Sequence, residues 1–579
     1  MTAEPIWGSD VVLSMLRELE IEFAAVMPGA SFRGIHDSIV NFGGDREPAL
    51  VLCPMDMATV SVARGYARVT GRPMVAIVHN LVGLLQSTMT IFDAWADRVP
   101  VIVLGGTGPV AADQRRPWID CIHTAQTQGH LVRDFTKWDD QPGSIAAVPA
   151  SLLRAHRMAV TEPPGPVYVC FDSAIQEGPV PESLVLPDVD RYRAAAPAAP
   201  RADVVEHVAA LLLAATLPVC VADRVGRSRE AFAALVELAE MLAMPVLDTG
   251  RMWHNFPTPH PLDFHGLDRE LLSSADLVLG LDPLDLAGTL ATHDRRPGGA
   301  STPTVVNVSN DELIHRGFVA DYQQLAAVDV PVLASPTSTL PLLVTTCAAA
   351  MTDAAAERIA RRRATLAPQH EALRQRQREA DRRARDGDVI TEARLIAEIW
   401  DAVGDVDVVF TVGQLRRMAP GVCDLPSTER FIGGGTGGGA VGSLLGVAIG
   451  AALAMKGTGK VPIALIGDGE MFASSPTLWT AAHYEVPSLF VVVNNRSYLN
   501  DEIHQGEIAR RRGRPQENRF NGTTLHDPPV DFAALARSMG MHGEGPVTAV
   551  ADLSAAVRRA VDGVAAGEPV VLDVWTDPR

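Results

Sequence analysis

The sequence predicts an α/β protein with three consecutive domains, each a doubly wound parallel sheet covered by helices. Short apolar runs of strand length alternate with helical patterns along almost the whole chain, which is typical of parallel sheets with helices on both faces. A chain of 579 residues is also too long for a single hydrophobic core. Two segments without an apolar period, 184–202 and 354–388, separate the runs into three series.

The first series defines a domain at residues 1–184. Its apolar runs end in Gly, Pro, Asn or polar residues, as expected for buried parallel strands followed by loops. A linker rich in Pro and Ala follows this domain. The expected strands are 22–29, 49–54, 73–80, 100–106 and 166–171.

The second series defines a central domain at residues 203–350, with strands expected at 217–223, 244–250, 277–282 and 303–309. Residues 351–388 follow as a helical linker that is polar and rich in Arg, with acidic residues interleaved. A solvated helix joining two domains explains this composition better than a nucleic-acid patch, because the chain as a whole is acidic.

The third series defines a domain at residues 389–579. Ligands of open parallel sheets gather at the carboxyl ends of the strands. The stretch IGDGEM, the pair Asn494-Asn495 and a glycine-rich segment at 433–442 all lie at such ends. The expected strands are 407–413, 429–435, 462–468, 488–495 and 569–575.

Composition excludes several classes of function. Fifty Lys and Arg residues against 69 Asp and Glu residues give a formal net charge of -19, which disfavours nucleic-acid and membrane partners. The six cysteines are scattered, without a CxxC pair, and favour a reduced chain. The start lacks the regions of a signal peptide, and the longest apolar run is too short to span a bilayer. We therefore expect a cytoplasmic protein.

Oxygen ligands at two neighbouring strand ends predict a magnesium site. Mg²⁺ binds hard oxygen ligands and usually takes few protein groups together with phosphate oxygens. Asp468 offers a carboxylate, Asn495 a side-chain amide oxygen and Ser497 a backbone carbonyl. Gly467 and Gly469 on either side of Asp468 leave room for a phosphate.

The glycine-rich segment allows a second interpretation, a nicotinamide-dinucleotide site. Residues 437–442 form a GxGxxG pattern between an expected strand and an expected helix. That motif requires an acid about 20 residues further on, at the end of the next strand. Asp468 is the acid that ends the next strand, but it lies further away and between glycines, so the metal site explains these residues better.

These motifs resemble those of the thiamine-diphosphate-dependent decarboxylase and carboligase family, which includes acetolactate synthase and benzoylformate decarboxylase. Further similar stretches are GYAR at 65–68, Lys137-Trp138, His260-Pro261 and LWTAA at 478–482, and the similarity extends over essentially the whole chain. The resemblance is strongest to benzoylformate decarboxylase. It implies pyrimidine-binding, central and diphosphate-binding domains in that order, and active sites in a homodimer, commonly within a homotetramer.

The resemblance also implies thiamine diphosphate and Mg²⁺ as cofactors. Asp468, Asn495 and the carbonyl of Ser497 would be the metal ligands. Gly439 would lend its backbone carbonyl to the cofactor's amino group, and Val441 would be the apolar wedge that bends the cofactor. The remaining residues assigned to the cofactor site are Gly467, Gly469, Glu470 and Tyr498. We see no clear flavin signature in the central domain.

Asp56 is the main departure from the family. Relatives carry a glutamate at this position, nine residues before the glycine of GYAR, where it protonates the cofactor's pyrimidine ring. An aspartate is one methylene shorter, so its oxygens sit about 1.5 Å further back. The alternative is a structural role, in which Asp56 caps the following helix.

Two histidines and a loop complete the candidate site. His79 matches a catalytic histidine of benzoylformate decarboxylase, while His123 falls where that enzyme has an apolar pocket residue. In the relatives, a serine that follows a Pro-Gly pair binds the substrate. This sequence has Ala30 at that position, and Ser31 follows it. Polar residues from Asn500 onward suggest a polar substrate.

We therefore expect a lyase or carboligase that decarboxylates or cleaves a 2-oxo acid or a related carbonyl compound, through an enamine at the cofactor. Three alternatives remain. A 2-hydroxyacyl-CoA or oxalyl-CoA type lyase would bind coenzyme A near Arg510. A nicotinamide-dependent dehydrogenase would carry a bound dinucleotide. A cofactor-binding protein with little or no activity would bind thiamine diphosphate without turnover.

Overall fold

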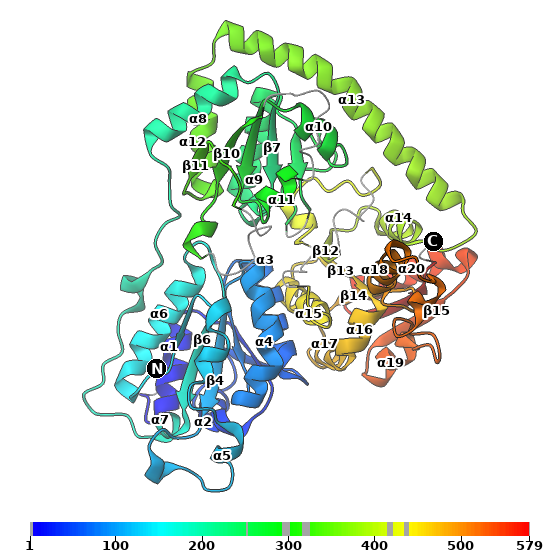
Figure 1. Cartoon of the computed structure of the whole chain (residues 1–579). Coiled ribbons are helices and arrows are strands. Elements are labelled where there is room, and N and C mark those ends of the chain that lie inside the picture. The colour runs from blue at the N-terminus through cyan, green and yellow to red at the C-terminus, as the bar shows by residue number, and fades with distance from the viewer. Residues whose placement is uncertain are drawn as a thin grey trace. The chain divides into compact units, whose positions relative to one another are not determined.

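The computed structural model describes residues 4–250, 253–291, 302–314, 325–413, 421–433 and 439–577. These residues form three sheets, and every pair of neighbouring strands in them is parallel (Figure 1). The predicted α/β fold class, three consecutive parallel-sheet domains, is confirmed.

The first sheet has six strands in the order β2-β1-β3-β4-β6-β5. Its two faces bury different side chains: Ala24 and Val26 of β1 enter one core, and Ala25 enters the other. This alternation shows that helices cover both faces. The strands are β1 Phe23–Val26, β2 Ala49–Leu52, β3 Met74–Ile77, β4 Val101–Thr107, β5 Trp138–Asp140 and β6 Val167–Asp172. The helices are α1 Gly8–Glu18, α2 Arg33–Asp37, α3 Asp56–Thr70, α4 Leu81–Ala96, α5 Asp120–His123, α6 Val148–Val160 and α7 Ser173–Glu177.

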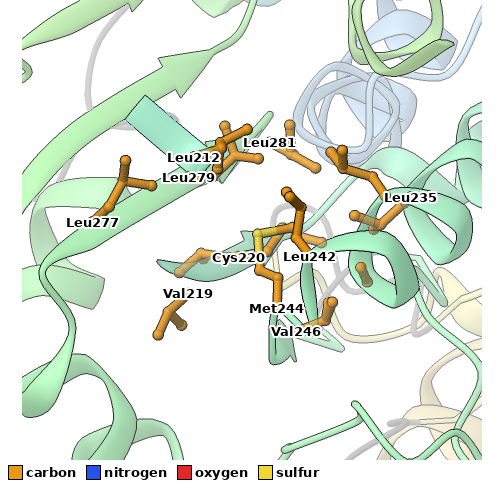
Figure 2. Close-up of a cluster of buried hydrophobic side chains, with 14 of the residues drawn as sticks. Leu212, Val219, Cys220, Leu235, Leu242, Met244, Val246, Leu277, Leu279 and Leu281 are labelled. Carbon is orange, nitrogen blue, oxygen red and sulfur yellow. The ribbon is translucent and has the colours of Figure 1, made fainter. Parts of the chain in front are cut away.

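The central sheet has five strands in the order β11-β10-β9-β7-β8. Its core is almost entirely aliphatic and includes Val219 and Cys220 of β7 and Leu279 of β9 (Figure 2). The strands are β7 Pro218–Ala222, β8 Val246–Asp248, β9 Leu277–Leu281, β10 Thr304–Val308 and β11 Val330–Val332. The helices are α8 Ala202–Ala214, α9 Arg229–Leu242, α10 Asp268–Ser274, α11 Leu286–Ala291 and α12 Pro336–Ala349.

The segment predicted as a helical linker forms one long helix, α13 (Asp353–Asp386). One side of it packs on the central domain, because Ala355, Ile359 and Leu366 belong to the central core. Arg362 lies on the same side of the helix. It donates to the carbonyl oxygens of four residues of the central domain, Leu242, Ala243, Ala215 and Thr216. The helix is therefore part of the central domain's packing, and most of its other arginines are exposed.

The third sheet has five strands in the order β12-β13-β14-β16-β15. The strand predicted at 429–435 is wrong in its described part, since Thr428–Arg430 forms a 3-10 turn. The strands are β12 Val408–Val412, β13 Val461–Gly467, β14 Ser488–Asn494, β15 His542–Val547 and β16 Pro569–Trp575. The helices are α14 Glu392–Val403, α15 Leu444–Met455, α16 Asp468–Ser474, α17 Leu478–His483, α18 Leu499–Arg511, α19 Phe532–Ser538 and α20 Val550–Ala565.

The first and third domains belong to one compact unit of residues 1–194, 388–412 and 436–579, and residues 195–387 and 413–435 form the other. Within the first unit, α3 and α15 pack closely through glycines. A Cβ on Gly65 would overlap the carbonyl oxygen of Val447, and a Cβ on Gly450 would overlap that of Val62. The helix that begins at Asp56 is therefore fixed against the third domain. The domain bounds given by the sequence stay a prediction.

No single helix among the described residues has both the length and the apolar character needed to cross a membrane. Taken together, α12 and α13 are long and apolar enough for a membrane span, but the pair is bent by 115°. Length and composition alone are weak evidence for such a span.

A buried ion cluster stabilises α3 against α4. Asp97 accepts hydrogen bonds from Arg64 Nε at 2.8 Å and from Arg68 Nη1 at 2.6 Å, and Arg64 also pairs with Asp93 at 3.2 Å. All four side chains are fully buried. Removing one partner from such a cluster leaves charge without compensation in a medium that solvates it poorly.

We expect Asp97→Asn to destabilise the protein by about 3 kcal/mol, because breaking a buried pair typically costs that much. The measurement is the urea midpoint of unfolding, followed by circular dichroism. The matched control is Asp203→Asn, which removes an exposed ion pair with Arg201 and should change stability by less than about 1 kcal/mol. Equal midpoints for the two variants would contradict the expectation.

Candidate active site

Asp468 lies where β13 ends and α16 begins, and it is 2% exposed. Its Oδ1 accepts from the Gly469 N–H at 2.9 Å, and its Oδ2 accepts from the Ser497 N–H at 3.0 Å. Burial raises the pKa of this carboxyl to about 6. The backbone of two neighbouring strand ends therefore holds the carboxylate in place.

The two asparagines at the end of β14, Asn494 and Asn495, make different contacts. Asn494 is 2% exposed, and its side chain donates to Asp573 Oδ1 on the neighbouring strand β16 at 2.9 Å. Asn495 Oδ1 accepts from the Ser497 N–H at 2.9 Å, the same N–H that Asp468 uses. Asn494 therefore joins β14 to β16 through its side chain. Asn495 places its side-chain oxygen at the Ser497 N–H, where the Asp468 carboxylate also lies.

The loop after Asn495 is held from both sides. The Ser497 hydroxyl donates to Glu502 Oε2 at 3.0 Å, and Glu502 also pairs with Arg519 at 3.2 Å. The ring of Tyr498 covers Gly469, since a Cβ on that glycine would lie 2.5 Å from the ring. Glu502, one of the polar residues expected to face a substrate, is therefore engaged in holding this loop.

Residues 434–438 of the glycine-rich segment, which include Gly437 and Gly438, lie outside the described residues. Gly439 is exposed with φ +73°, and Val441 is 49% exposed. Glu470 reaches this segment from α16: its carboxylate accepts from the N–H of Gly442 at 2.7 Å and from that of Leu444 at 2.6 Å. Glu470 thus holds the amino end of α15 next to Val441.

This arrangement fits a hydrated divalent cation and a diphosphate. The oxygens of Asp468 and Asn495 converge on the Ser497 N–H. Apart from the chain neighbours, no atom of the described part of the chain lies within 4 Å of the position that a Cβ would take on Gly439 or Gly467. Among the described residues there is no cluster of three or more His, Cys, Asp or Glu side chains that would hold a metal alone. Mg²⁺ usually binds through one or two protein groups and takes its other ligand oxygens from water and phosphate.

Asp56 is the first residue of α3 and is 8% exposed. Its Oδ1 accepts from the His79 backbone N–H at 2.8 Å, and its own N–H donates to Gln86 Oε1 at 2.7 Å. The N-cap residue of α3 is Met55, whose side chain makes no cap hydrogen bond. Burial is the main cause that raises the pKa of the Asp56 carboxyl. The carboxylate is thus oriented by the backbone N–H of His79, which follows β3.

Two family models match the parts of the chain that carry these sites. The thiamine pyrophosphate enzyme N-terminal TPP binding domain matches residues 6–133, and the C-terminal TPP binding domain matches residues 411–574. Between them they cover about half of the chain, including Asp56, Asp468 and Asn495. The chain belongs to the thiamine pyrophosphate enzyme family.

Individual relatives agree with this assignment. Acetolactate synthase large subunit of Lactococcus lactis is 30% identical over 167 residues, which are 29% of this chain and 28% of that protein. Benzoylformate decarboxylase of Pseudomonas aeruginosa is 26% identical over 550 residues, 90% of each chain. The chain spans less than half the length of the first acetolactate synthases that it matches.

A solved benzoylformate decarboxylase from Polynucleobacter necessarius has the same fold, with a TM-score of 0.75 over 98% of both chains at 18% identity. At this identity the likeness concerns the fold alone.

In this thiamine pyrophosphate enzyme, His79 lies close to Ser31 and His123, two other predicted site residues of the first domain. Its Nδ1 lies 3.0 Å from Ser31 Oγ, and its ring centroid lies 5.0 Å from that of His123. Burial, followed by the nearby His123, lowers the pKa of His79. Ala30 is exposed, whereas Ser31 is 2% exposed.

The structure therefore gathers the predicted residues of this thiamine pyrophosphate enzyme into two groups. Asp56, Ser31, His79 and His123 form one in the first domain, and the residues around Asp468 form the other in the third. Met57, which follows Asp56 in the chain, approaches Gly442 of the third domain, since its Cε lies 3.3 Å from the position of a Cβ on that glycine. Asn500 is exposed in the first turn of α18.

Sequence reasoning did not identify three supporting contacts. Asp573 holds Asn494, Gln86 binds the N–H of Asp56, and Arg496 lies over the Trp575 ring at 4.6 Å with a φ of +59°. The pair Asn494-Asn495 was the signal in the sequence for the contact between Asn494 and Asp573. The other two depend on how distant segments meet, which no local pattern shows.

Proposed function

We propose that this protein is a thiamine-diphosphate- and Mg²⁺-dependent lyase or carboligase, at least homodimeric, that breaks a carbon–carbon bond in a 2-oxo acid or a related carbonyl compound. The observation that carries the proposal is the convergence of the Asp468 and Asn495 oxygens on the Ser497 N–H, next to Gly467, whose Cβ position has no atom of the described residues within 4 Å. The similarity to acetolactate synthase and benzoylformate decarboxylase supports the reaction class.

The residues of the third domain would bind the cofactor. Asp468 and Asn495, with the carbonyl of Ser497, would hold Mg²⁺ against the diphosphate. Glu470 would act indirectly, because it fixes the N–H groups of Gly442 and Leu444 and thereby the segment that carries Gly439 and Val441. When bound, the cofactor supplies an electron sink for carbon–carbon bond cleavage.

Asp56 would hold a proton for the cofactor's pyrimidine ring. The His79 N–H fixes Oδ1 of Asp56, and the raised pKa of this buried carboxyl favours a proton on it. A buried carboxyl that can hold a proton suits general acid–base chemistry.

Two polar atoms near His79 in the first domain are left for a ligand to bind. Among the described residues, Asn80 Oδ1 and His123 Nδ1 are buried without a hydrogen-bond partner. Buried polar atoms left unpaired cost free energy, so a ligand that bonds them is favoured over an apolar one. These atoms support a substrate with polar groups next to its reacting carbonyl, and His79 and His123 would transfer its protons.

The test is a reaction panel with the purified full chain. Pooled 2-oxo acids and aldehydes are incubated with thiamine diphosphate and Mg²⁺, and products are identified by mass spectrometry. We expect loss of CO₂ or formation of a hydroxyketone that requires both additions. Thiamine monophosphate is the matched control, because it keeps the thiazolium ring and lacks the diphosphate that Mg²⁺ would help to hold.

Other outcomes decide between the remaining functions. Cleavage of an acyl-CoA without reaction of any free acid would favour the coenzyme A lyase. Binding of the cofactor with no product from any member of the panel would favour a protein without catalytic activity. Equal turnover with the monophosphate, or without Mg²⁺, would refute the proposed cofactor site.

A further inference from the structure

A buried serine hydroxyl lies behind the imidazole of His79. Ser31 Oγ is 3.0 Å from His79 Nδ1, and Ser31 is 2% exposed. The backbone N–H of Asn80 points at both atoms, at 2.9 Å from His79 Nδ1 and 3.2 Å from Ser31 Oγ. Three polar groups therefore meet on one side of the imidazole.

The hydrogen-bond roles at this junction follow from the chemistry of the groups. A backbone N–H only donates, so the Nδ1 atom that it faces must accept and carries no proton. In the neutral imidazole the proton is then on Nε2. Because Ser31 Oγ also accepts from the Asn80 N–H, its own proton is free to donate to Nδ1. Both donors stabilise the same neutral tautomer.

The position of Ser31 is fixed by its surroundings. Gln176 on α7 donates from Nε2 to the Ser31 carbonyl oxygen at 2.9 Å. The backbone of β4 lies directly behind Ser31, since a Cβ on Gly106 would be 2.8 Å from the Ser31 Cβ. On the other side, a Cβ on Gly29 would be 2.8 Å from Cγ of the His79 ring. The backbone at Gly106 and at Gly29 therefore packs closely against Ser31 and His79, respectively.

Few charged groups act on this imidazole. His123 of α5 lies at a ring distance of 5.0 Å, and Asp56 of α3 contacts His79 through its backbone N–H. The groups that α7 and the turn at Ser31 bring to the cluster, Gln176 and Ser31, are neutral. Both burial and His123 lower the pKa of His79, in agreement with an imidazole held neutral.

We propose that Ser31 is a positioning residue that holds His79 neutral with its proton on Nε2, so that His79 meets the substrate as a hydrogen-bond donor. The tautomer depends only on residues of this chain, whereas the part played by the substrate rests on the proposed function. A neutral Nε2–H donates to an acceptor oxygen, such as the carboxylate or carbonyl of a 2-oxo acid. Ser31 then supports recognition through His79 and does not bind the substrate itself.

The test is nuclear magnetic resonance of the protein without cofactor, with isotope-labelled histidine. His79→Gln identifies the His79 signals by their loss. We expect the wild type to show an unprotonated Nδ1 and a protonated Nε2 at neutral pH. In Ser31→Ala one donor to the neutral form is lost, so the pKa of His79 should rise by roughly half to one pH unit, as a hydrogen bond of ordinary strength implies.

The matched control is Ser38→Ala, which removes another buried serine hydroxyl of the first domain, one that bonds Ser9 and Asp10. It should leave the His79 titration unchanged. A wild-type Nδ1–H tautomer, or identical His79 titrations in the two serine variants, would overturn the proposal. If Ser31→Ala does not fold, the wild-type tautomer still decides.

Kinetics separate this inference from the proposed function. With an active 2-oxo acid, the acid limb of kcat/KM should move to higher pH in Ser31→Ala and stay in place in Ser38→Ala, because the neutral imidazole is the working form. If the tautomer is as expected and no substrate reacts, the proposed function fails alone. If substrates react and the tautomer is reversed, the positioning role fails alone.

Discussion

Replacing Asp468 by alanine is expected to weaken the binding of thiamine diphosphate by at least about 100-fold in the presence of Mg²⁺, since changes even to supporting residues of metal sites often reach that size. The substitution removes one of two converging side-chain oxygens. It also removes an acceptor from the N–H groups of Gly469 and Ser497, so the strand ends lose their common anchor. The measurement is titration calorimetry at saturating Mg²⁺.

Asp501→Ala is the matched control for this variant. It makes the same chemical change three residues after Tyr498, at an exposed position in the first turn of α18. Its affinity for the cofactor should stay within about twofold, the change expected when no contact is lost. If both variants bind the cofactor as tightly as the wild type, the metal site does not lie at Asp468.

The sequence predicts every strand in the interior of the sheets correctly, and also the apolar edge strands β2, β8 and β12. Their runs are apolar because both faces are buried, as in β4 and β6. The missed strands β5, β11 and β15 are edge strands, where one side stays accessible and Asp, Pro or Gly is tolerated. The run at 429–435 gave a false signal because Phe431 and Ile432 are buried outside a strand.

The meeting of two polar residues at the candidate site was predictable because both follow buried strands. Asp468 and Asn495 follow adjacent parallel strands, so the topology alone brings them together. The hydrogen bonds of Glu470 to the amides of α15, and of Ser31 to His79, join segments distant in the chain. No periodicity encodes such pairs, because they depend on how the packed domains and loops meet.

Asp56→Asn is expected to slow proton exchange at C2 of the bound cofactor by roughly 100-fold or more, the usual contribution of a positioned acid–base group. Asparagine keeps the size of the side chain and an oxygen that can accept from the His79 N–H. It cannot exchange a proton with the pyrimidine ring. Cofactor affinity should change little, because the proposed metal ligands are untouched. The exchange rate is measured in deuterium oxide by acid quench and proton magnetic resonance.

The same variant separates the catalytic role from a structural one. Asparagine caps helices as well as aspartate does, so a capping role predicts a normal exchange rate and unchanged stability. Asp56→Ala, in contrast, leaves the His79 N–H without its acceptor and should add a stability loss of about 1 kcal/mol to the loss of exchange. Wild-type exchange in Asp56→Asn would show that the shorter acid at this position does not activate the cofactor, and that another group must hold the proton.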